Sequence, residues 1–192
     1  MNVLFVDIDG VLNNVFDNYN IYVVEETIIV LKKMCELYNA KVVISSSCKP
    51  NPYYEEDGEE PKLTQVHEAL QRHGIELLGH TPLVSVEEGF VSIGSLKEFE
   101  IIYYLETHPE IEHFAILDDN DNIDFGLLRS HLIEVGYYDE EGHFKGGLRD
   151  EDIPAVGEAL KLDNPYRNLI AQEREYRVRR RERQIKNQVD KP

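Results

Sequence analysis

The sequence has little of what marks a disulfide-bonded, zinc-binding or membrane-spanning protein. It contains two cysteines, Cys35 and Cys48, in no metal-binding spacing, and seven histidines without a paired HxxxH pattern. No stretch approaches the roughly 20 apolar residues that a transmembrane helix requires. The chain also begins directly with an expected strand rather than with a basic and then apolar signal, so we expect a cytoplasmic protein without membrane contact.

Basic residues are scarce over most of the chain. The formal net charge is −17, but residues 164–192 hold nine Lys and Arg against four Asp and Glu, which leaves −22 on residues 1–163. An acidic body repels phosphate backbones at long range, so contact with nucleic acid would be local or made by the basic tail. Solubility alone is the alternative explanation of this charge.

The length and composition fit one domain with a sizeable core. The chain has 192 residues, of which 42% are apolar, and we place the domain at residues 1–163. Residues 164–192 begin with a proline at a helix-start position and then mix charges at helical spacing, which predicts an exposed helical tail. This tail either contacts phosphates through RVRRR, or packs against the acidic body, or is simply solvated. The pattern indicates no particular oligomeric state.

Strand-like and helix-like patterns alternate along the domain. Strands are predicted at 2–6, 41–44, 75–78, 113–117 and 131–135, and helices at 25–38, 63–73 and 150–162 and after Ser95, an N-cap that forms a capping box with Glu98. This alternation predicts a parallel sheet with helices on both faces, an α/β fold. Ligands bind such sheets at the carboxyl ends of the strands. Asp7/Asp9, Ser45/Ser46 and Asp118/Asp119 should therefore converge there.

The stretch FVDIDG places two aspartates directly after a buried strand. Neighbouring carboxylates repel each other, so water, a proton or a cation must offset the charge. Mg²⁺ prefers oxygen ligands and takes one or two protein carboxylates, which Asp7 and one of Asp118/Asp119 would supply. The stretch DDNDN that contains the second pair is, taken alone, also typical of a solvated turn.

Four segments together resemble a known superfamily. FVDIDGVL, VVISSSCK, Lys97 and FAILDDND resemble, in order and spacing, the four motifs of the haloacid dehalogenase (HAD) superfamily, over residues 1–163. Within it, the chain is similar to the HAD domain of Swiss Army Knife RNA repair proteins. The resemblance implies a HAD-like three-layer α/β/α sandwich with a central parallel sheet, and an enzyme that is a Mg²⁺-dependent phosphatase.

The resemblance also implies roles for the two acids of the first motif. Asp7 would be the nucleophile that forms an aspartyl-phosphate, and Asp9 the general acid for the leaving group. The backbone carbonyl of Asp9 would join Asp7, Asp118 and Asp119 around the metal ion. An aspartate at position 9 is typical of phosphoester chemistry and argues against a dehalogenase.

Two further motifs would bind the transferring phosphoryl group. By the resemblance, Ser46 or Ser45 would contribute a hydroxyl and Lys97 a positive charge. The alternative for Lys97 is an ordinary surface lysine in the first turn of a helix, where the helix dipole slightly disfavours a cation.

The spacing of the motifs predicts an open site with a minimal cap domain or none. Residues 10–25 leave room for only a short turn, and residues 50–61 would form at most a small lid. An open site favours a large phosphoester, such as a nucleic-acid end. Cys48 and Lys49 stand where the relatives have tryptophan and arginine, which removes stacking and bidentate phosphate contacts. The alternatives are a nucleotidase for free mononucleotides and a non-catalytic RNA-binding module.

Overall fold

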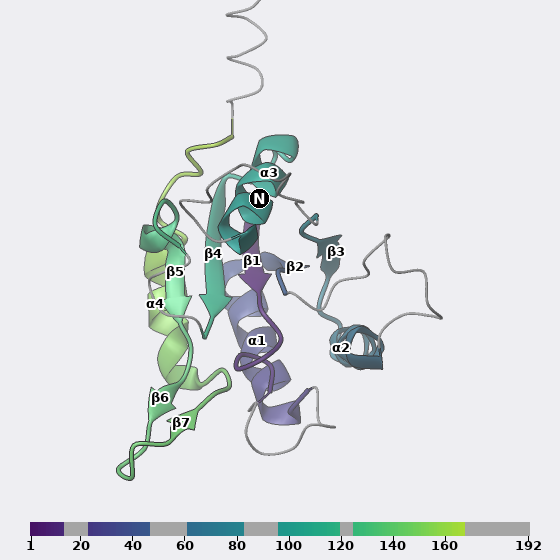
Figure 1. Ribbon diagram of the computed structural model, residues 1–192. Helices are drawn as coiled ribbons and strands as arrows, with labels where there is room; N and C mark the ends of the chain where they lie inside the picture. The colour runs from purple at the N-terminus through teal and green to yellow at the C-terminus, as the bar shows by residue number, and fades with distance from the viewer. Residues whose placement is uncertain (14–22, 47–60, 83–95, 120–124, 168–192) are drawn as a thin grey trace, which may run out of the picture.

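A five-stranded, all-parallel sheet forms the centre of the molecule, and helices cover both of its faces (Figure 1). The computed structural model describes residues 1–13, 23–46, 61–82, 96–119 and 125–167. The strand order is β3-β2-β1-β4-β5. This arrangement confirms the predicted three-layer α/β fold. No helix among the described residues is long and apolar enough to cross a membrane.

The elements follow one another along the chain as strands and crossover helices. The sheet consists of β1 (Asn2–Val6), β2 (Ala40–Ile44), β3 (Leu77–His80), β4 (His113–Asp118) and β5 (Leu132–Glu134). The helices are α1 (Glu25–Tyr38), α2 (Pro61–Arg72), α3 (Leu96–Thr107) and α4 (Ile153–Ala159), with short 3-10 turns η1 (Arg129–His131) and η2 (Asp150–Asp152). Strands β6 (Tyr137–Tyr138) and β7 (Phe144–Lys145) form an antiparallel hairpin.

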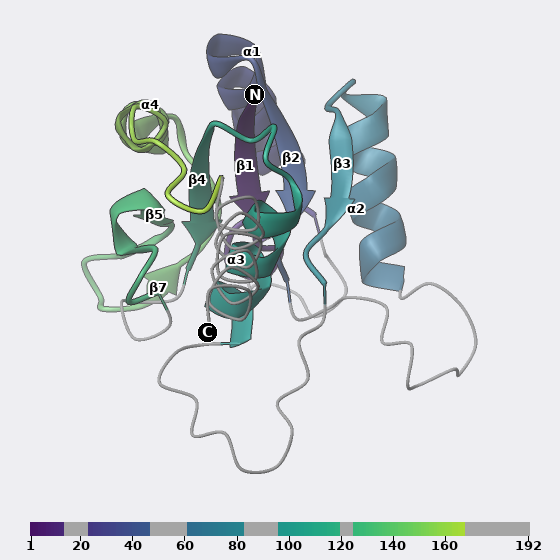
Figure 2. The same ribbon diagram turned by 90° about the horizontal axis from the view of Figure 1, so that it is seen from above.

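Two apolar cores lie on the two sides of the sheet. Helices α1, α2 and α4 cover one face and α3 covers the other (Figure 2). Side chains alternate along a strand, so Leu4 and Val6 of β1 face α1 whereas Val3 and Phe5 face α3. The Phe5 ring packs edge to face on Tyr104 of α3, with ring centroids 5.7 Å apart. This alternation decides which residues face α3 beyond the strand ends.

Three elements differ from the prediction by two residues or more at one end, and the first is α2, which begins at Pro61 rather than at residue 63. β3 begins at Leu77, two residues later than expected, because Gly74 (φ +70°) ends α2 and the N–H of Ile75 still donates to Leu70 O (2.9 Å). The last helix was expected at 150–162, but η2 precedes α4, which ends at Ala159. The carboxylate of Asp152 accepts a hydrogen bond from the Arg149 N–H (2.8 Å) and so fixes the tighter first turn.

Several predictions fall outside the described residues. They concern Ser95 with its capping box, the small lid at residues 50–61 apart from Pro61, the minimal or missing cap domain, and Cys48 and Lys49. Of the tail, residues 164–167 are described and lie against the domain. Asn164 is buried and its side-chain amide donates to Ile111 O (3.0 Å), while Arg167 pairs with Glu112 at 2.8 Å. The tail therefore begins as part of the domain surface.

Candidate active site

Three polar side chains lie side by side at the carboxyl ends of the central strands. The Asp7 N–H donates to Leu117 O (3.0 Å) and the Ser45 N–H donates to Val6 O (2.8 Å), so both ladders continue one residue beyond the strands. Asp118 is the last residue of β4. Because Val6 and Leu117 belong to the core on the α1 face, alternation turns Asp7, Ser45 and Asp118 toward α3.

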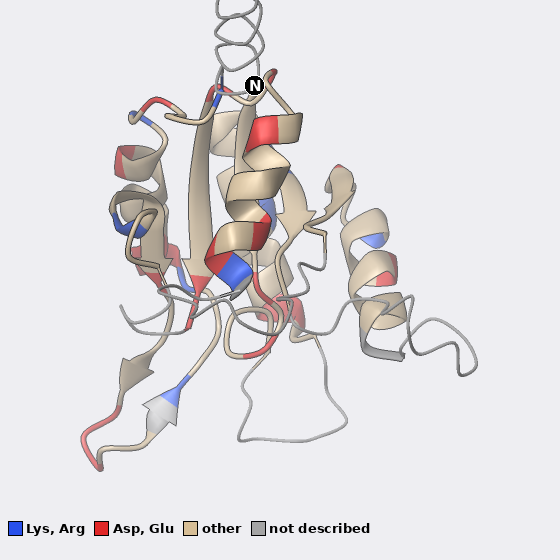
Figure 3. Ribbon diagram, turned by 45° about the horizontal axis from the view of Figure 1, so that its top comes forward, with Lys and Arg blue, Asp and Glu red and all other residues tan. Residues whose placement is uncertain are grey.

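Lys97 joins two of these strand ends from the first turn of α3. Its Nζ lies 3.0 Å from Asp7 Oδ2 and donates a hydrogen bond to Asp118 Oδ2 at 2.6 Å. The Lys97 side chain is only 15% exposed and that of Asp118 only 1%. Burial opposes the charge on Lys97, but the charges and hydrogen bonds of Asp7 and Asp118 outweigh it and raise the pKa of the lysine. Lys97 is thus a mostly buried cation that bridges Asp7 and Asp118. Figure 3 shows acidic residues at the carboxyl ends of the central strands.

Asp119 completes a cluster of three carboxylates. Asp7, Asp118 and Asp119 each offer an oxygen within 4.8 Å of the others, which makes the cluster a group that could hold a metal ion. Burial, followed by repulsion from Asp7 and Asp118, raises the pKa of Asp119 to about 6, although Lys97 counteracts the rise. Three carboxylates against one lysine leave excess negative charge in a mostly buried space.

Gly10 makes room for this cluster. A Cβ atom at position 10 would lie 2.1 Å from Asp119 Oδ2, and Gly10 has φ +73°, a conformation that costs other residues free energy. The glycine of the first motif is therefore needed both for the turn after β1 and for the close approach of the fourth motif. The sequence pattern pointed to Gly10 as part of a motif, but the contact with Asp119 follows only from the fold.

Asp9 is oriented by a residue that the sequence analysis missed. Asn13 is buried, and its side-chain amide donates to Asp9 Oδ1 at 3.1 Å. The Asn13 carbonyl oxygen accepts a hydrogen bond from the Gly10 N–H at 3.0 Å. The backbone turn at Ile8 to Leu12 brings these groups together, since the Leu12 N–H donates to Ile8 O (2.8 Å). The only signal in the sequence was an asparagine four residues after Asp9; its burial and its contact follow from the fold.

The two candidate serines differ in position. Ser45 lies next to Asp7 across the β1–β2 ladder, and its buried Oγ has no hydrogen-bond partner in the structure. Ser46 is also buried but lies one residue further along the chain. The register therefore places Ser45, rather than Ser46, at the level of Asp7 and Asp118.

Glu98 connects α3 to the segment that follows the acidic pair of β4. It is 1% exposed, and its Oε1 accepts hydrogen bonds from the backbone N–H groups of Leu127 (2.6 Å) and Leu128 (2.8 Å). These bonds hold the chain after Asp119 against the turn of α3 that carries Lys97. The sequence analysis assigned Glu98 only to a helix cap, because a contact 29 residues away leaves no local pattern.

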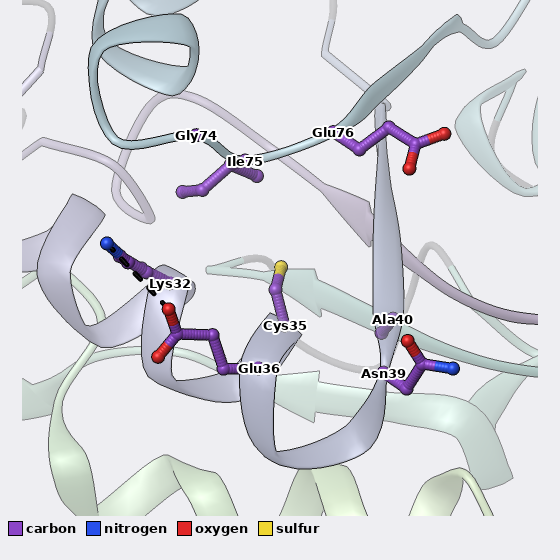
Figure 4. Close-up of a pocket in the computed structure, with 8 residues that line it drawn as sticks. All are labelled: Lys32, Cys35, Glu36, Asn39, Ala40, Gly74, Ile75 and Glu76. Carbon is purple, nitrogen blue, oxygen red and sulfur yellow. Dashed lines mark ion pairs between the residues drawn. The ribbon is translucent and has the colours of Figure 1, made fainter.

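Two other groups of residues lie away from this site. The pocket lined by Lys32, Cys35, Glu36, Asn39, Ala40, Gly74, Ile75 and Glu76 is at the opposite, amino-terminal end of the strands (Figure 4). Burial, and then the charge of Glu36, raises the pKa of the Cys35 thiol to about 12, so the thiol is neutral at pH 7. On the β6–β7 hairpin, Asp139, Glu141 and His143 also cluster, but Glu141 and His143 are exposed.

Comparison with known proteins identifies the family. Neither curated proteins nor solved structures gave a match. The model of one family, described as the HAD domain in Swiss Army Knife RNA repair proteins, matches residues 3–141. This range contains the five strands of the central sheet apart from Asn2, together with Lys97 and the clustered acids. The match confirms the resemblance found in the motifs, and the chain belongs to the family of HAD domains in Swiss Army Knife RNA repair proteins.

Proposed function

We propose that the protein is a Mg²⁺-dependent phosphomonoester hydrolase that works through an aspartyl-phosphate. Family membership supports hydrolase chemistry. The observation that carries the proposal is the mostly buried bridge from Lys97 to Asp7 and Asp118, with Asp119 beside it. A nucleophilic carboxylate, a cation for phosphoryl oxygens and a set of oxygen ligands are thereby gathered in one place.

The reaction would proceed in two displacements at phosphorus. An Oδ atom of Asp7 attacks the phosphorus, the bond to the leaving oxygen breaks, and the Asp9 carboxyl group gives that oxygen its proton. Water then attacks the phosphorus of the aspartyl-phosphate while Asp9 takes a proton from it, which releases phosphate and restores Asp7. The hydrogen bond from Asn13 to Asp9 Oδ1 supports this assignment, because it orients the carboxyl group and leaves the proton to Oδ2.

Lys97 and a serine hydroxyl would hold the phosphoryl oxygens during both displacements. Lys97 supplies a charge fixed within 3.0 Å of the nucleophile. For the second contact we favour Ser45 over Ser46, because Ser45 lies in register beside Asp7 and its hydroxyl has no hydrogen-bond partner.

The clustered carboxylates fit a hard divalent cation. Asp7, Asp118 and Asp119 provide the oxygen donors that Mg²⁺ prefers. Burial, and then repulsion from Asp7 and Asp118, raises the pKa of Asp119, and a bound cation would relieve the repulsion. The backbone carbonyl of Asp9 would be a further ligand, as the resemblance implies. When bound, the ion neutralises charge on the phosphoryl oxygens and positions the substrate.

Hydrolysis of p-nitrophenyl phosphate tests the proposal. We expect activity that requires Mg²⁺ and that falls by about 10³-fold or more in Asp7→Asn, because the nucleophile is lost. Asp150→Asn is the matched control, since Asp150 pairs with Lys33 on the surface far along the chain from the motifs. Full activity in Asp7→Asn would exclude the covalent mechanism. No activity in the wild-type protein would favour a non-catalytic, RNA-binding module.

The substrate class that we propose is a phosphorylated nucleic-acid end. The RNA-repair setting named for the family supports it, and free mononucleotides are the alternative. Release of phosphate from 3′- or 5′-phosphorylated oligonucleotides should exceed release from mononucleotides. A chain ending at Arg167 tests the basic tail without disturbing the buried Asn164, and only its oligonucleotide activity should fall and lose salt dependence. Equal activity on both substrates would favour a nucleotidase.

A further inference from the structure

The end of β3 carries a buried hydroxyl that the proposed reaction does not use. Thr81 follows β3 and is 2% exposed, and its Oγ1 has no hydrogen-bond partner in the structure. The Thr81 N–H donates to Ile44 O at 2.9 Å, so the β2–β3 ladder continues one residue beyond His80. Thr81 is therefore held in line with the other strand ends.

The side chain of Thr81 lies on the same side of the sheet as Lys97. His80 is in register with Ile44, which faces the α1 side, and its Nε2 lies 2.8 Å from Nε2 of His67 in α2. The next residue along an extended chain points the other way, so Thr81 faces α3. Ser45 follows Ile44 in the same manner. Asp118, Asp7, Ser45 and Thr81 thus form one row along the carboxyl edge of β4, β1, β2 and β3.

The row contains two adjacent hydroxyls that lack a partner. A buried hydroxyl without a hydrogen bond is destabilising, and native proteins contain few of them. Valine has nearly the same shape as threonine and would fill the position of Thr81 without this cost. The neighbouring hydroxyl, Ser45, is in the same state and is the one that we assign to the phosphoryl group. Because the Thr81 hydroxyl is buried and unpartnered in the same way as that of Ser45, it points to a ligand as well.

The distance along the row decides what Thr81 can reach. Neighbouring strands are about 4.8 Å apart, so Thr81 lies about 10 Å from Asp7 along the edge and about 5 Å beyond Ser45. A phosphoryl group held between Asp7, Ser45 and Lys97 is too small to reach it. The rest of the substrate, beyond the phosphoryl group, is long enough to reach Thr81.

We infer that Thr81 is a specificity-determining residue whose hydroxyl binds an oxygen on the leaving group of the substrate. This inference rests on the proposed function and adds a second binding position to it. The oxygen is either a sugar hydroxyl of the first nucleotide or an oxygen of the next phosphodiester. A leaving group without such oxygens, for instance a phenyl group, makes no use of Thr81.

Kinetics of Thr81→Val on three substrates test the inference. The substrates are phenyl phosphate, a nucleoside monophosphate and a phosphorylated dinucleotide, with Thr107→Val as the control because Thr107 is exposed at the far end of α3. We expect Thr81→Val to raise KM for the nucleotide substrates about five- to tenfold more than for phenyl phosphate, with kcat little affected. If KM for the nucleoside monophosphate rises as much as KM for the dinucleotide, Thr81 contacts a sugar oxygen. If only KM for the dinucleotide rises, Thr81 contacts the phosphodiester.

Thermal unfolding separates this role from a structural one. Thr81→Val should leave Tm unchanged or raise it, because no hydrogen bond is lost. Thr27→Val should lower Tm, because the buried Thr27 hydroxyl shares its proton between the carbonyl oxygens of Leu12 (2.8 Å) and Val24 (2.7 Å). Equal KM changes on all three substrates, or none, would overturn the inference while leaving the phosphatase proposal intact. A fall in Tm of the size seen in Thr27→Val would assign Thr81 a structural role instead.

Calorimetry gives a readout that does not need turnover. The Asp7→Asn protein and the Asp7→Asn/Thr81→Val protein are titrated with the phosphorylated dinucleotide and with inorganic phosphate. We expect the second substitution to weaken dinucleotide binding about five- to tenfold and to change phosphate binding much less. If the wild-type protein hydrolyses no phosphoester, the proposed function fails, and this titration still decides on Thr81. Equal dinucleotide affinities, or no binding to either protein, would overturn the inference.

Discussion

Charged side chains are arranged differently at the two ends of the parallel sheet. At the amino end, charged groups are exposed and paired with opposite charges, as in Lys41 with Glu76 at 2.5 Å and Lys32 with Glu36 at 3.7 Å. At the carboxyl end, three carboxylates crowd around one lysine, and the Asp118 side chain is 1% exposed. Pairing at the surface contributes little stability and needs no ligand. Like charges gathered out of water are unfavourable, which supports the proposal that a ligand binds at this end.

Removal of a lysine at each end should give the largest difference. Lys97→Met leaves Asp7 and Asp118 buried without their cation, so we expect the free energy of unfolding to fall by about 3–5 kcal/mol. Lys41→Met removes a pair whose lysine is 36% exposed, and the loss should stay below about 1 kcal/mol. Urea unfolding in EDTA measures both. Equal losses would mean that the two ends do not differ.

Two glycines with the same backbone conformation sharpen the comparison. Gly10 and Gly74 have φ +73° and +70°, so alanine at either position costs about 1–2 kcal/mol in backbone strain. Gly74→Ala, in the amino-end pocket, meets no atom within 4 Å, whereas Gly10→Ala meets Asp119. We expect Gly10→Ala to lose more stability than Gly74→Ala. If Mg²⁺ binds as we propose, it should raise Tm in Gly74→Ala and raise it much less in Gly10→Ala. A normal response of Gly10→Ala to Mg²⁺ would contradict the role of Asp119 as a ligand.

A smaller effect is expected for the buried acid of α3. Glu98→Ala leaves the N–H groups of Leu127 and Leu128 without a partner, which should cost about 2 kcal/mol and lower kcat, since α3 positions Lys97. Glu98→Gln keeps an acceptor oxygen, so it should lose less stability and less kcat than Glu98→Ala. Glu36→Ala, in an exposed pair at the amino end, is the control. Unfolding and kinetics are measured on the same preparations, and a normal kcat in Glu98→Ala would remove the positioning role.

The smallest effect concerns His131 in the turn before β5. The ring is buried, stacks on Phe114 at 3.9 Å and lies 3.0 Å from Phe114 O, and its burial lowers its pKa despite that backbone contact. Below pH 6.5 the unfolded chain therefore binds a proton that the folded chain does not, so stability falls as the pH drops through this region. Between pH 7.5 and 5.5 the wild-type protein should therefore lose stability relative to His131→Phe in urea unfolding, because only the wild-type protein carries this titrating group. An identical pH dependence in both proteins would contradict this assignment.

Much of the fold could be predicted because its signals are local. The apolar run at 2–6, the helical spacing at 25–38 and the run before Asp118 each occupy one short segment, and the observed β1, α1 and β4 agree with them to within a residue. β3 was placed two residues early because the Ile75 N–H, just after the end of α2 at Gly74, still donates a hydrogen bond to the helix, which the sequence does not reveal. The start of α4 was missed because the side chain of Asp152 tightens the preceding turn.

For the candidate site, the positions of the predicted strands were enough to name the acids and the two serines, and the resemblance to the HAD motifs was needed to name Lys97. The tertiary structure decided how these groups meet. It placed Lys97 between Asp7 and Asp118, Asp119 against Gly10, and Glu98 under the chain at 127–128. It also brought Asn13 to Asp9 and placed Thr81 in the row beside Ser45. The physical reason is that strand register and side-chain alternation act between segments dozens of residues apart, whereas a sequence pattern records only neighbours.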